Sequence, residues 1–387
     1  MYLRRLFVTV LLILPVVFST KCKIWAASYS APDTAYDLSA KIGINPSLFN
    51  LGDMTWASGD NAIYMATEET GFCGLWLLMR YAPGTDDLHN NLNNGSAGCQ
   101  SYPNIWNWAS VTYDQDSNTI YGGARGTWWG GFQEYIINTS TFLKDISGPP
   151  ITPGMPGTVA YDTASKTVYA GTYRWDGPGG DLLAYNTQTG IVVHLGIQLV
   201  FLWSSNYDIR AVIDDPVNHA LYIGGASGKL AKYNILAGTM QNLDVSSVMG
   251  KATISSLAFD QPSGTLYFAG GNLLGAYHAD GTVANLTQNI SPVMGTDGIY
   301  KIIAADGYIY AGGSSGKFLR YNIHGGKTTD LSGRIAPFWG NNTIRAMAFD
   351  VTDDAVFLAG NYGRFARYNP APQVPPVISA KVIPWLP

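Results

Sequence analysis

A set of polar residues recurs at one position of an internal repeat, where the repeated segment begins a predicted strand. The set combines guanidinium and hydroxyl groups and consists of Arg210, Ser255, Tyr300 and Arg345. Charge-assisted hydrogen bonds from such groups can hold a carboxylate or a phosphate. We expect Asp53 to lie close to them. Ion pairs with Asp208 or Asp297 would account for the arginines without a ligand, so both interpretations stand at this stage.

Aromatic residues form a second candidate set, because they gather in the longer predicted loops. They are Trp128, Trp129, Trp175, Trp203, Tyr207, Trp339 and Tyr362. Aromatic rings suit sugars and other planar or amphipathic ligands, and they anchor protein partners. The alternative is that these rings pack between structural elements, because large aromatic side chains also dominate the energetics of protein cores.

Support for catalysis is weak. The histidines fall on predicted outer strands or short turns, so we expect neither a His-ligated metal nor a His general base among the aromatic loops. No Gly-rich stretch opens a helix as a phosphate-binding loop does, and we predict no cofactor. Glycoside hydrolysis needs two carboxylates at a defined separation, which could come from Asp53, Asp176, Asp208 and Asp297. We name no catalytic residue and leave the enzymatic question open.

A repeat must position both sets of residues. One tyrosine near the end of the third strand of each copy marks the repeat seven times: Tyr81, Tyr135, Tyr185, Tyr233, Tyr277, Tyr321 and Tyr368. By subtraction, successive tyrosines lie 44 to 54 residues apart. Three copies align best, namely IRAVIDDPVNHALYIGGASGKLAKYN from Ile209, ISSLAFDQPSGTLYFAGGNLLGAYHAD from Ile254 and IRAMAFDVTDDAVFLAGNYGRFARYN from Ile344. Short β-branched and aromatic runs separated by Gly, Asn and Asp indicate four strands per copy.

Seven copies of four antiparallel strands predict an all-β fold, a seven-bladed β-propeller. The last copy ends after its third strand, at Asn369, and the missing strand lies at the other end of the chain. AYDLSAKI from Ala35 matches TTDLSGRI from Thr328, the fourth strand of the sixth copy. We therefore predict that an N-terminal strand completes blade 7 and covers the edges of an open ring.

With these repeats, the chain resembles the β-propeller superfamily, including proteins with quinoprotein-like and YVTN-type repeats. The resemblance covers about residues 34 to 369 and concerns architecture. No WD dipeptide, kelch double-glycine signature or aspartate-box motif assigns a narrower family.

The four strands of a blade, named a to d from the axis outwards, divide the connections between two faces. The b–c and d–a loops emerge on one, the loop face, while the short a–b and c–d turns emerge on the turn face. Aspartates recur where strand a ends, and we expect them to cap turns: Asp114, Asp162, Asp215, Asp260 and Asp350. Pairs of small residues end strand b, which suits crowded packing near the axis.

The two ends of the chain are predicted to lie outside the propeller. Residues 1–26 are typical of a secretory signal peptide, with two arginines, an apolar stretch and small residues after it. An uncleaved anchor is the alternative, although a membrane span needs about 20 apolar residues. The predicted location is therefore secreted, extracellular or periplasmic, with membrane contact only if this segment stays attached. Residues 370–387 form a Pro-rich tail to which we assign no role.

Cys73 and Cys99 both fall on the loop face, and export into an oxidising compartment would favour a disulfide between them. The net charge is −4 and 13% of residues are charged, which gives no electrostatic footprint for nucleic acid. We therefore expect a secreted binding module whose aromatic loop face takes a glycan, a small ligand or a protein partner. The alternative is a carbohydrate-active enzyme, a glycosidase or polysaccharide lyase, with its site at the mouth of the axial channel.

Overall fold

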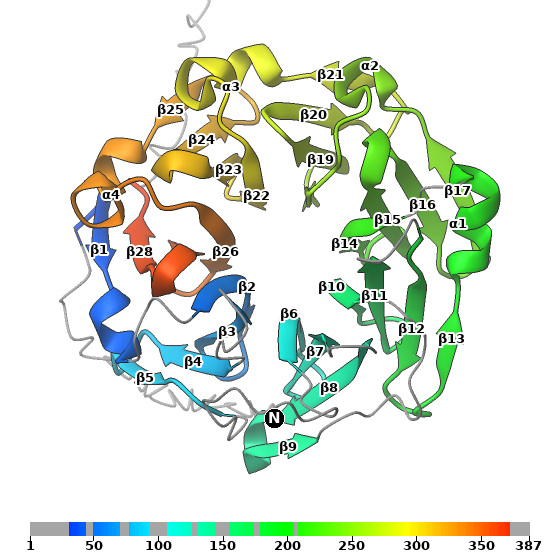
Figure 1. Ribbon diagram of the computed structural model, residues 1–387, viewed down its shortest axis with the longest axis horizontal. Coiled ribbons are helices and arrows are strands. Elements are labelled where there is room, and N and C mark those ends of the chain that lie inside the picture. Colours follow the sequence, from blue (N-terminus) through cyan, green and yellow to red (C-terminus); the bar gives the residue numbers. More distant parts are fainter. Residues whose placement is uncertain are drawn as a thin grey trace, which may run out of the picture.

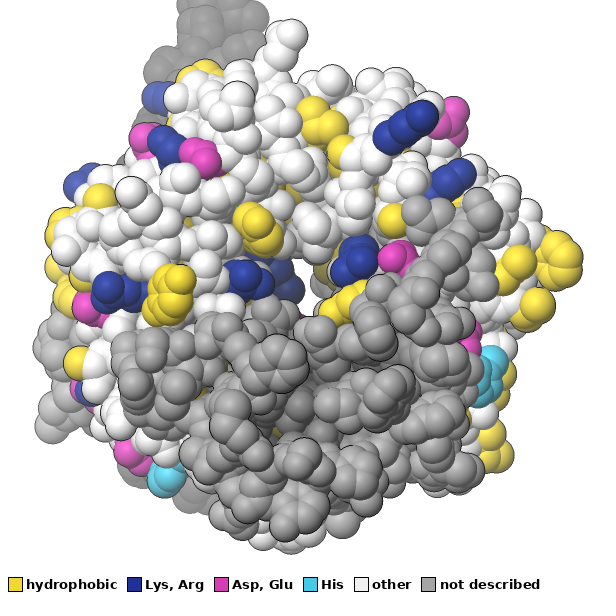
Figure 2. Space-filling view, in the orientation of Figure 1, with side chains coloured by type: hydrophobic (Ala, Val, Ile, Leu, Met, Phe, Trp, Pro, Cys, Tyr) yellow, Lys and Arg dark blue, Asp and Glu magenta, His cyan; other side chains and the backbone are white. Residues whose placement is uncertain are grey.

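The computed structural model describes residues 31–43, 49–69, 77–92, 107–125, 130–143, 155–173, 179–204 and 208–371. These residues form seven four-stranded antiparallel sheets arranged as blades around a central axis (Figure 1). The predicted seven-bladed β-propeller is confirmed. The centre of the ring stays open, as the space-filling view shows (Figure 2). None of the helices in the described part of the chain has the length and apolar character that crossing a bilayer requires.

The first three blades follow one another along the chain. Blade 1 contains β2 (Phe49–Ala57), β3 (Ala62–Glu69), β4 (Leu78–Ala82) and β5 (Asp87–His89). Blade 2 contains β6 (Asn107–Asp114), β7 (Thr119–Arg125), β8 (Gly130–Ile136) and β9 (Thr141–Leu143). Blade 3 contains β10 (Met155–Asp162), β11 (Thr167–Tyr173), β12 (Leu182–Asn186) and β13 (Val192–His194).

The other four blades continue the ring. Blade 4 contains β14 (Ile209–Asp215), β15 (Ala220–Gly225), β16 (Leu230–Asn234) and β17 (Thr239–Leu243). Blade 5 contains β18 (Ser256–Asp260), β19 (Thr265–Gly270), β20 (Leu273–Tyr277) and β21 (Val283–Asn285). Blade 6 contains β22 (Ile299–Ala305), β23 (Tyr308–Gly313), β24 (Phe318–Asn322) and β25 (Thr328–Asp330). Blade 7 contains β26 (Ile344–Asp350), β27 (Ala355–Gly360), β28 (Phe365–Asn369) and the N-terminal β1 (Thr34–Asp37).

The predicted ring closure is confirmed by β1, which pairs antiparallel with β28 in the register Thr34↔Asn369 to Asp37↔Ala366. The match extends past the strand into side-chain detail. Ser39 Oγ accepts the Phe365 N–H at 3.1 Å, and Ser332 Oγ accepts the Phe318 N–H at 3.1 Å. The segment after β1 therefore makes the same contact with blade 7 that the segment after β25 makes with blade 6.

Small residues end strand b because the backbone at the start of strand a passes directly over them. A Cβ on Gly270 would lie 1.7 Å from the Thr253 carbonyl oxygen, and one on Gly313 would lie 2.4 Å from that of Gly298. Neither distance leaves room for a side chain. The predicted crowding is thus real. Main-chain oxygens of the same blade cause it at these two positions, and the Ile254 side chain of the next blade causes it at Gly224, where a Cβ would lie 2.6 Å away.

Aspartates at the end of strand a cap the a–b turns as predicted. Asp215 is fully buried, and its carboxylate accepts the Asn218 backbone N–H at 3.1 Å and the Asn218 side-chain amide at 2.9 Å. Asp114 accepts the N–H of Asp116 at 2.8 Å in the same way. These bonds satisfy turn donors that would otherwise lack a partner.

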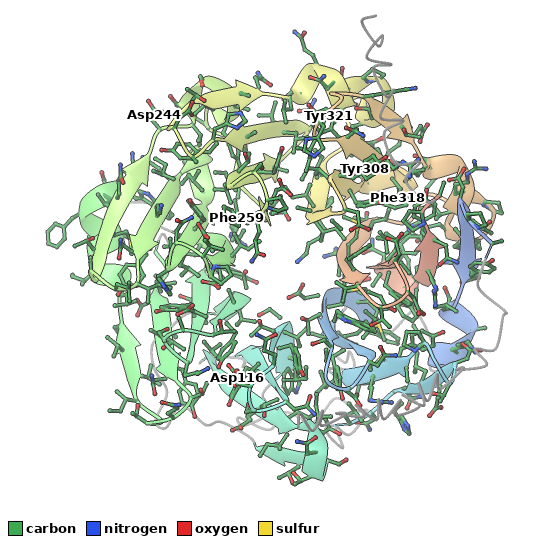
Figure 3. The ribbon with its side chains drawn as sticks, turned by 180° about the vertical axis from the view of Figure 1, so that it is seen from behind. Asp116, Asp244, Phe259, Tyr308, Phe318 and Tyr321 are labelled. Carbon is green, nitrogen blue, oxygen red and sulfur yellow. The ribbon has the colours of Figure 1, made fainter. Side chains whose placement is uncertain are left out.

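The d–a connections contain helices that the sequence analysis missed. They are α1 (Gly196–Trp203), α2 (Ser246–Met249), α3 (Thr287–Met294) and α4 (Ser332–Trp339). Three of them have eight residues each, too few for a helical period to stand out. Their inward side chains, such as Leu199 and Trp203 of α1, are buried in the core. Seen from behind, Phe318 lies well inside its blade, whereas Phe259 borders the central opening (Figure 3).

Candidate functional site

A β-bulge near the start of strand a shapes the mouth of the axial channel. In β14 the ladder pairs Ile209 with Gly225 and then Ala211 with Gly224, which leaves Arg210 without a partner across the strand pair. Tyr300 in β22 and Arg345 in β26 occupy the same bulged position. Ser255 directly precedes the paired part of β18. A bulge re-aims the side chain of the extra residue, and all four predicted residues line one cavity at the mouth.

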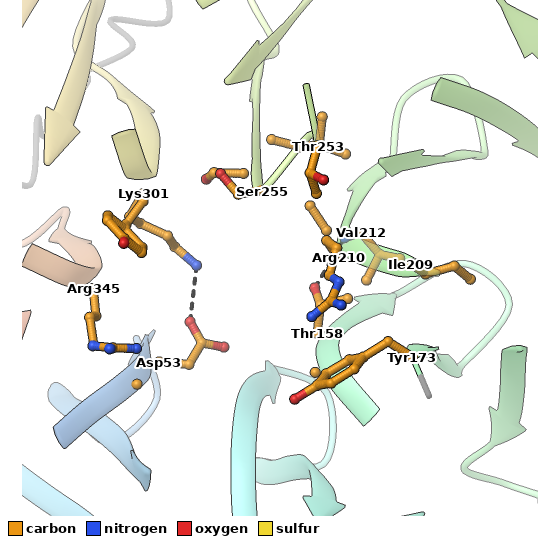
Figure 4. Close-up of a pocket in the computed structure, with 16 residues that line it drawn as sticks. Asp53, Thr158, Tyr173, Ile209, Arg210, Val212, Thr253, Ser255, Lys301 and Arg345 are labelled. Carbon is orange, nitrogen blue, oxygen red and sulfur yellow. Dashed lines mark hydrogen bonds and ion pairs between the residues drawn. The ribbon is translucent and has the colours of Figure 1, made fainter. Parts of the chain in front are cut away.

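This mouth cavity has a volume of about 390 Å³ and is lined by residues from six of the blades. Its cations are Arg210, Lys301 and Arg345, against a single lining carboxylate, Asp53. Arg210 and Tyr173 lie on one side of the opening, and Lys301, Asp53 and Arg345 lie on the other (Figure 4). The mouth is therefore richer in positive charge than a chain with net charge −4 would lead one to expect.

Asp53 and Lys301 form an ion pair that the sequence analysis only partly anticipated. Lys301 Nζ lies 2.9 Å from Asp53 Oδ1, and Asp53 Oδ2 accepts the Val111 N–H at 3.1 Å. The pair joins blade 6 to blade 1, because blade 7 carries only the small Ala346 at the equivalent position. Asp53 was expected near the polar set, but Lys301 was missed. The sequence signal for Lys301 was a long cationic side chain at a repeat position where blades 4 and 5 have the small residues Ala211 and Ser256.

Each arginine of the mouth combines a polar partner with a tyrosine ring. Arg210 lies 3.3 Å from the Asp208 carboxylate and 4.0 Å from the centre of the Tyr173 ring. The predicted pairing of Arg210 with Asp208 therefore exists. Arg345 Nε donates to Asn361 Oδ1, and its guanidinium lies 5.9 Å from the centre of the Tyr300 ring. A tyrosine ring and a polar partner together fix the position and orientation of a guanidinium group.

The hydroxyl groups near the mouth mainly serve the fold. Ser255 Oγ lies within hydrogen-bond distance of the carbonyl oxygens of Ala269 and Ile299, at 3.3 and 3.2 Å. One residue deeper, Thr158 Oγ1 accepts the Val212 N–H and Ser256 Oγ accepts the Ile302 N–H, both at 3.0 Å. These bonds join blade 3 to blade 4 and blade 5 to blade 6. Asp297 accepts the Ser315 hydroxyl at 2.8 Å.

Two of the predicted aromatic ligand residues lie in the core instead. Trp203 is 2% exposed and Trp339 is fully buried, because each ends a d–a helix and points inward. Their rings are not accessible to a ligand, which corrects the expectation and supports the packing alternative for this pair. Tyr300 and Tyr362 are 45% and 53% exposed. Trp128, Trp129, Trp175, Tyr207, Cys73 and Cys99 lie outside the described residues.

Below the mouth, the channel continues as a second cavity of about 450 Å³ that shares Asp53 and Lys301 with the first. Asp214 lines it at a position where blade 5 has Phe259 and blade 7 has Phe349. Burial, together with the nearby carboxylates of Asp162 and Asp215, raises the pKa of Asp214 to about 8. Its Oδ1 has no hydrogen-bond partner among the described residues. At neutral pH this end of the channel therefore presents a largely protonated carboxyl.

The described ranges contain no group of three or more His, Cys, Asp or Glu side chains able to hold a metal ion. No described histidine lines the mouth cavity. His194 instead lies 2.6 Å from Asp181, and His89 lies 3.1 Å from Asp87. The chemistry available at the mouth is thus that of cations, hydroxyl groups and tyrosine rings.

Comparison with known proteins identifies the fold and nothing narrower. No family model matches the sequence, and no curated protein matches it. Many chains of solved structures do match. One belongs to a structure described as "Crystal Structure of Mitotic Checkpoint Complex", with a TM-score of 0.64, 10% sequence identity, and coverage of 96% of this chain and 100% of that one. An identity of this size carries information on architecture alone. By fold, the chain is a seven-bladed β-propeller, and its assignment to YVTN-type or quinoprotein-like repeats stays a prediction.

Proposed function

We propose that this protein is an interaction module that binds a carboxylate-bearing segment of a protein partner at the mouth of its axial channel. The observation that carries the proposal is the convergence of Arg210, Lys301 and Arg345 on one cavity with a single lining carboxylate. Three cations on an otherwise acidic chain create a local positive potential that attracts anions. Propellers commonly present such a face to a partner, and the solved structure reported above is a multiprotein complex by its description.

The geometry favours a carboxylate as the recognised group. An arginine guanidinium can donate two parallel hydrogen bonds to a carboxylate. Arg210 is partly exposed, with 37% of its side-chain surface accessible, and its contact with Asp208 at 3.3 Å leaves other N–H groups for a ligand. Tyr300 and Tyr362 place half-exposed rings on the same face, and such rings pack well against the aliphatic parts of a peptide.

An acidic partner suits this mouth better than a neutral glycan does. Neutral sugars are recognised mainly by stacking on aromatic rings. In the described lining, the cations outnumber the aromatic rings, which are those of Tyr173 and Tyr300.

The N-terminal sequence supports the further proposal that binding takes place outside the cytoplasm. That segment, residues 1–26, lies outside the described residues.

The enzyme alternative receives less support. Glycoside hydrolysis requires one carboxyl group to donate a proton and a second to act on the opposite side of the bond. In the described part of the mouth, Asp53 contacts Lys301 at 2.9 Å and Asp208 contacts Arg210 at 3.3 Å. Each of these carboxylates is thus paired with a cation of the protein. Binding explains the arrangement with fewer assumptions.

The test is a binding experiment with two matched peptide pools. One pool contains fluorescent hexapeptides rich in Asp and Glu, and the other has Asn and Gln at the same positions. We expect anisotropy to report binding of the acidic pool only. Arg210→Gln and Arg345→Gln should each weaken it about 10-fold, since a hydrogen bond to a charged group contributes about 1.5 to 3 kcal/mol. Lys251→Gln is the matched control, because Lys251 is an exposed cation that does not line the mouth.

Two results would contradict the proposal. One is equal binding of the acidic and the amide pools by the wild-type protein. The other is unchanged binding of the acidic pool by the Arg210→Gln, Arg345→Gln double variant, after circular dichroism has shown that the variant is folded.

A further inference from the structure

A group of exposed apolar side chains lies on the outer rim at blade 3 and the adjoining edge of blade 4, far from the channel mouth. We call it the rim patch and define it by five side chains that are 48% to 82% exposed: Ile191, Val193, Ile197, Phe201 and Leu236. Phe201 is the most exposed of them, at 82%. Figure 2 shows hydrophobic side chains projecting at the rim where Figure 1 places α1 and β13. Monomeric proteins rarely leave such side chains grouped in water.

The rim patch departs from the repeat that surrounds it. The positions of Ile191, Val193, Ile197 and Phe201 correspond in blade 5 to Thr282, Ala284, Gln288 and Pro292, and in blade 6 to Lys327, Thr329, Gly333 and Pro337. The inward positions of the helix are occupied normally, by Leu199 and Trp203. The outward apolar residues are therefore additions to the fold, because the core of the blade is already complete without them.

The five side chains belong to one rigid surface. Ile191 and Val193 lie on or beside β13, and α1 follows after a single residue. Gln198 Nε2 of α1 donates to the Gly238 carbonyl at 3.3 Å, which holds the helix against the turn that carries Leu236. An equivalent bond joins Asn289 to Gly326 in the next pair of blades, at 3.2 Å. The patch is thus presented by a connection that the repeat itself keeps in place.

We infer that the rim patch is the contact surface of a symmetric dimer, and that its occupant is a second copy of this chain. β13 is the outermost strand of its sheet, and no described strand pairs with its outer edge. An antiparallel strand edge can pair with a copy of itself across a two-fold axis, which matches the isologous contacts of most homodimers. Apolar side chains on both sides of the axis would then cover one another.

Charge also favours a second copy. The stretch from Ile191 to Trp203, IVVHLGIQLVFLW, contains no Lys, Arg, Asp or Glu. Two copies can approach through it without repulsion between like charges. A helix that lies on an anionic membrane normally carries Lys or Arg on its polar face, and α1 has none. The inference does not depend on the proposed function, because no rim-patch residue lines the mouth cavity.

The exposed apolar side chains supply more than half of the area that a stable dimer requires. Five large side chains exposed to this degree offer roughly 100 Å² each, against ~800 Å² per partner in a stable interface. The remaining area is available from the edge of β13 and the polar side chains around it. A typical interface has the same composition, with an apolar centre and a polar rim.

Sedimentation velocity of the full chain over a range of concentrations tests the inference. We expect a species of twice the 41.7 kDa chain mass, less any segment removed from it, that dissociates on dilution. Phe201→Ser and Ile197→Ser should each raise the dimer dissociation constant at least 10-fold. Val351→Ser is the matched control, because Val351 is 68% exposed in blade 7 and lies outside the patch. Both patch residues point into water, so these variants should fold normally.

A nitroxide label at Gln188→Cys, an exposed position in the turn before β13 and outside the rim patch, gives a second readout. Symmetric pairing through β13 predicts a short distance between the two labels of a dimer in double electron–electron resonance, and adding Phe201→Ser to the labelled chain should remove this distance. A monomer at the highest concentration, or a dimer that both serine variants leave intact, would overturn the inference.

Discussion

The two ends of the seven innermost strands differ in how strictly they follow the repeat. At the turn end, aspartates cap the a–b turns of five blades through buried carboxylates such as that of Asp215. At the mouth end, the bulged position holds Gly52 and Gly157 in two blades and Arg210, Tyr300 and Arg345 in three others. The turn end is constrained because the fold needs its hydrogen bonds. The bulged position is outside the ladder, so the pairing of the strands does not fix which side chain it carries.

The largest expected effect lies at the turn end. Asp215→Ala should lower the free energy of unfolding by about 2 kcal/mol, because it removes two hydrogen bonds to a buried charged acceptor. Urea denaturation followed by circular dichroism measures the change. Asp215→Asn keeps one acceptor oxygen and should recover part of the loss. A change below about 0.5 kcal/mol in the alanine variant would break the contrast between the two ends.

Asp214 makes stability depend on pH. Its pKa is about 8 in the folded protein, above its ordinary value of 3.8, so folding favours the protonated form. The contribution of Asp214 to the free energy of unfolding is therefore fully present below its ordinary pKa of 3.8, and it is lost as pH rises through the folded-state pKa of about 8. Asp214→Asn should match the wild type near pH 4 and exceed it by ~1 kcal/mol at pH 9. Thermal melts at the two pH values measure the difference, and an equal offset at both would refute the assignment.

Thr158 tests whether the first residue after the bulge already contributes to stability. It follows Gly157 by one residue and accepts the Val212 N–H of the next blade at 3.0 Å. Thr158→Val keeps the shape, removes the acceptor, and should cost about 1 kcal/mol of unfolding free energy. Thr158→Ser retains the hydroxyl and serves as the control. Equal stability of the two variants would show that the bond between blades contributes nothing.

The smallest effect on stability is expected at the mouth itself. Arg210→Gln and Tyr300→Phe should each change the free energy of unfolding by less than about 0.5 kcal/mol, as is usual for partly exposed positions. The same Arg210 variant should lose acidic-peptide binding. A loss of stability comparable to that of Asp215→Ala would mean that the mouth end is structural as well, and the contrast would fail.

Much of the architecture could be predicted from the sequence, because each copy of the repeat can be aligned with the others and the same strands found in each. The recurring tyrosines counted the blades, and the match of AYDLSAKI to TTDLSGRI located the closing strand. The short d–a helices escaped because eight residues span only about two turns. Trp203 and Trp339 were misassigned for the same reason, since without the helices nothing indicated that they point inward.

The site was harder to predict than the fold, because it depends on contacts between blades. The start of strand a was visible in the alignment, and the four residues that the repeat places there, three of them at a bulge, line one cavity at the mouth. The ion pair between Lys301 and Asp53 joins residues 248 positions apart. No local pattern reports which side chains meet across the axis, and only the closed ring brings these two together.

The closing strand also fixes the order of assembly during synthesis. β1 leaves the ribosome before every other described strand, yet its partner β28 is made last among them. Blades 1 to 6 contain only strands that are consecutive in the chain, so each can form as soon as its own residues emerge. Blade 7 must wait, and β1 stays without its strand partner until β28 has been made. A nascent chain of this protein therefore carries an open strand edge over the whole interval between the synthesis of β1 and that of β28, and an open edge is a site for unwanted pairing with other chains.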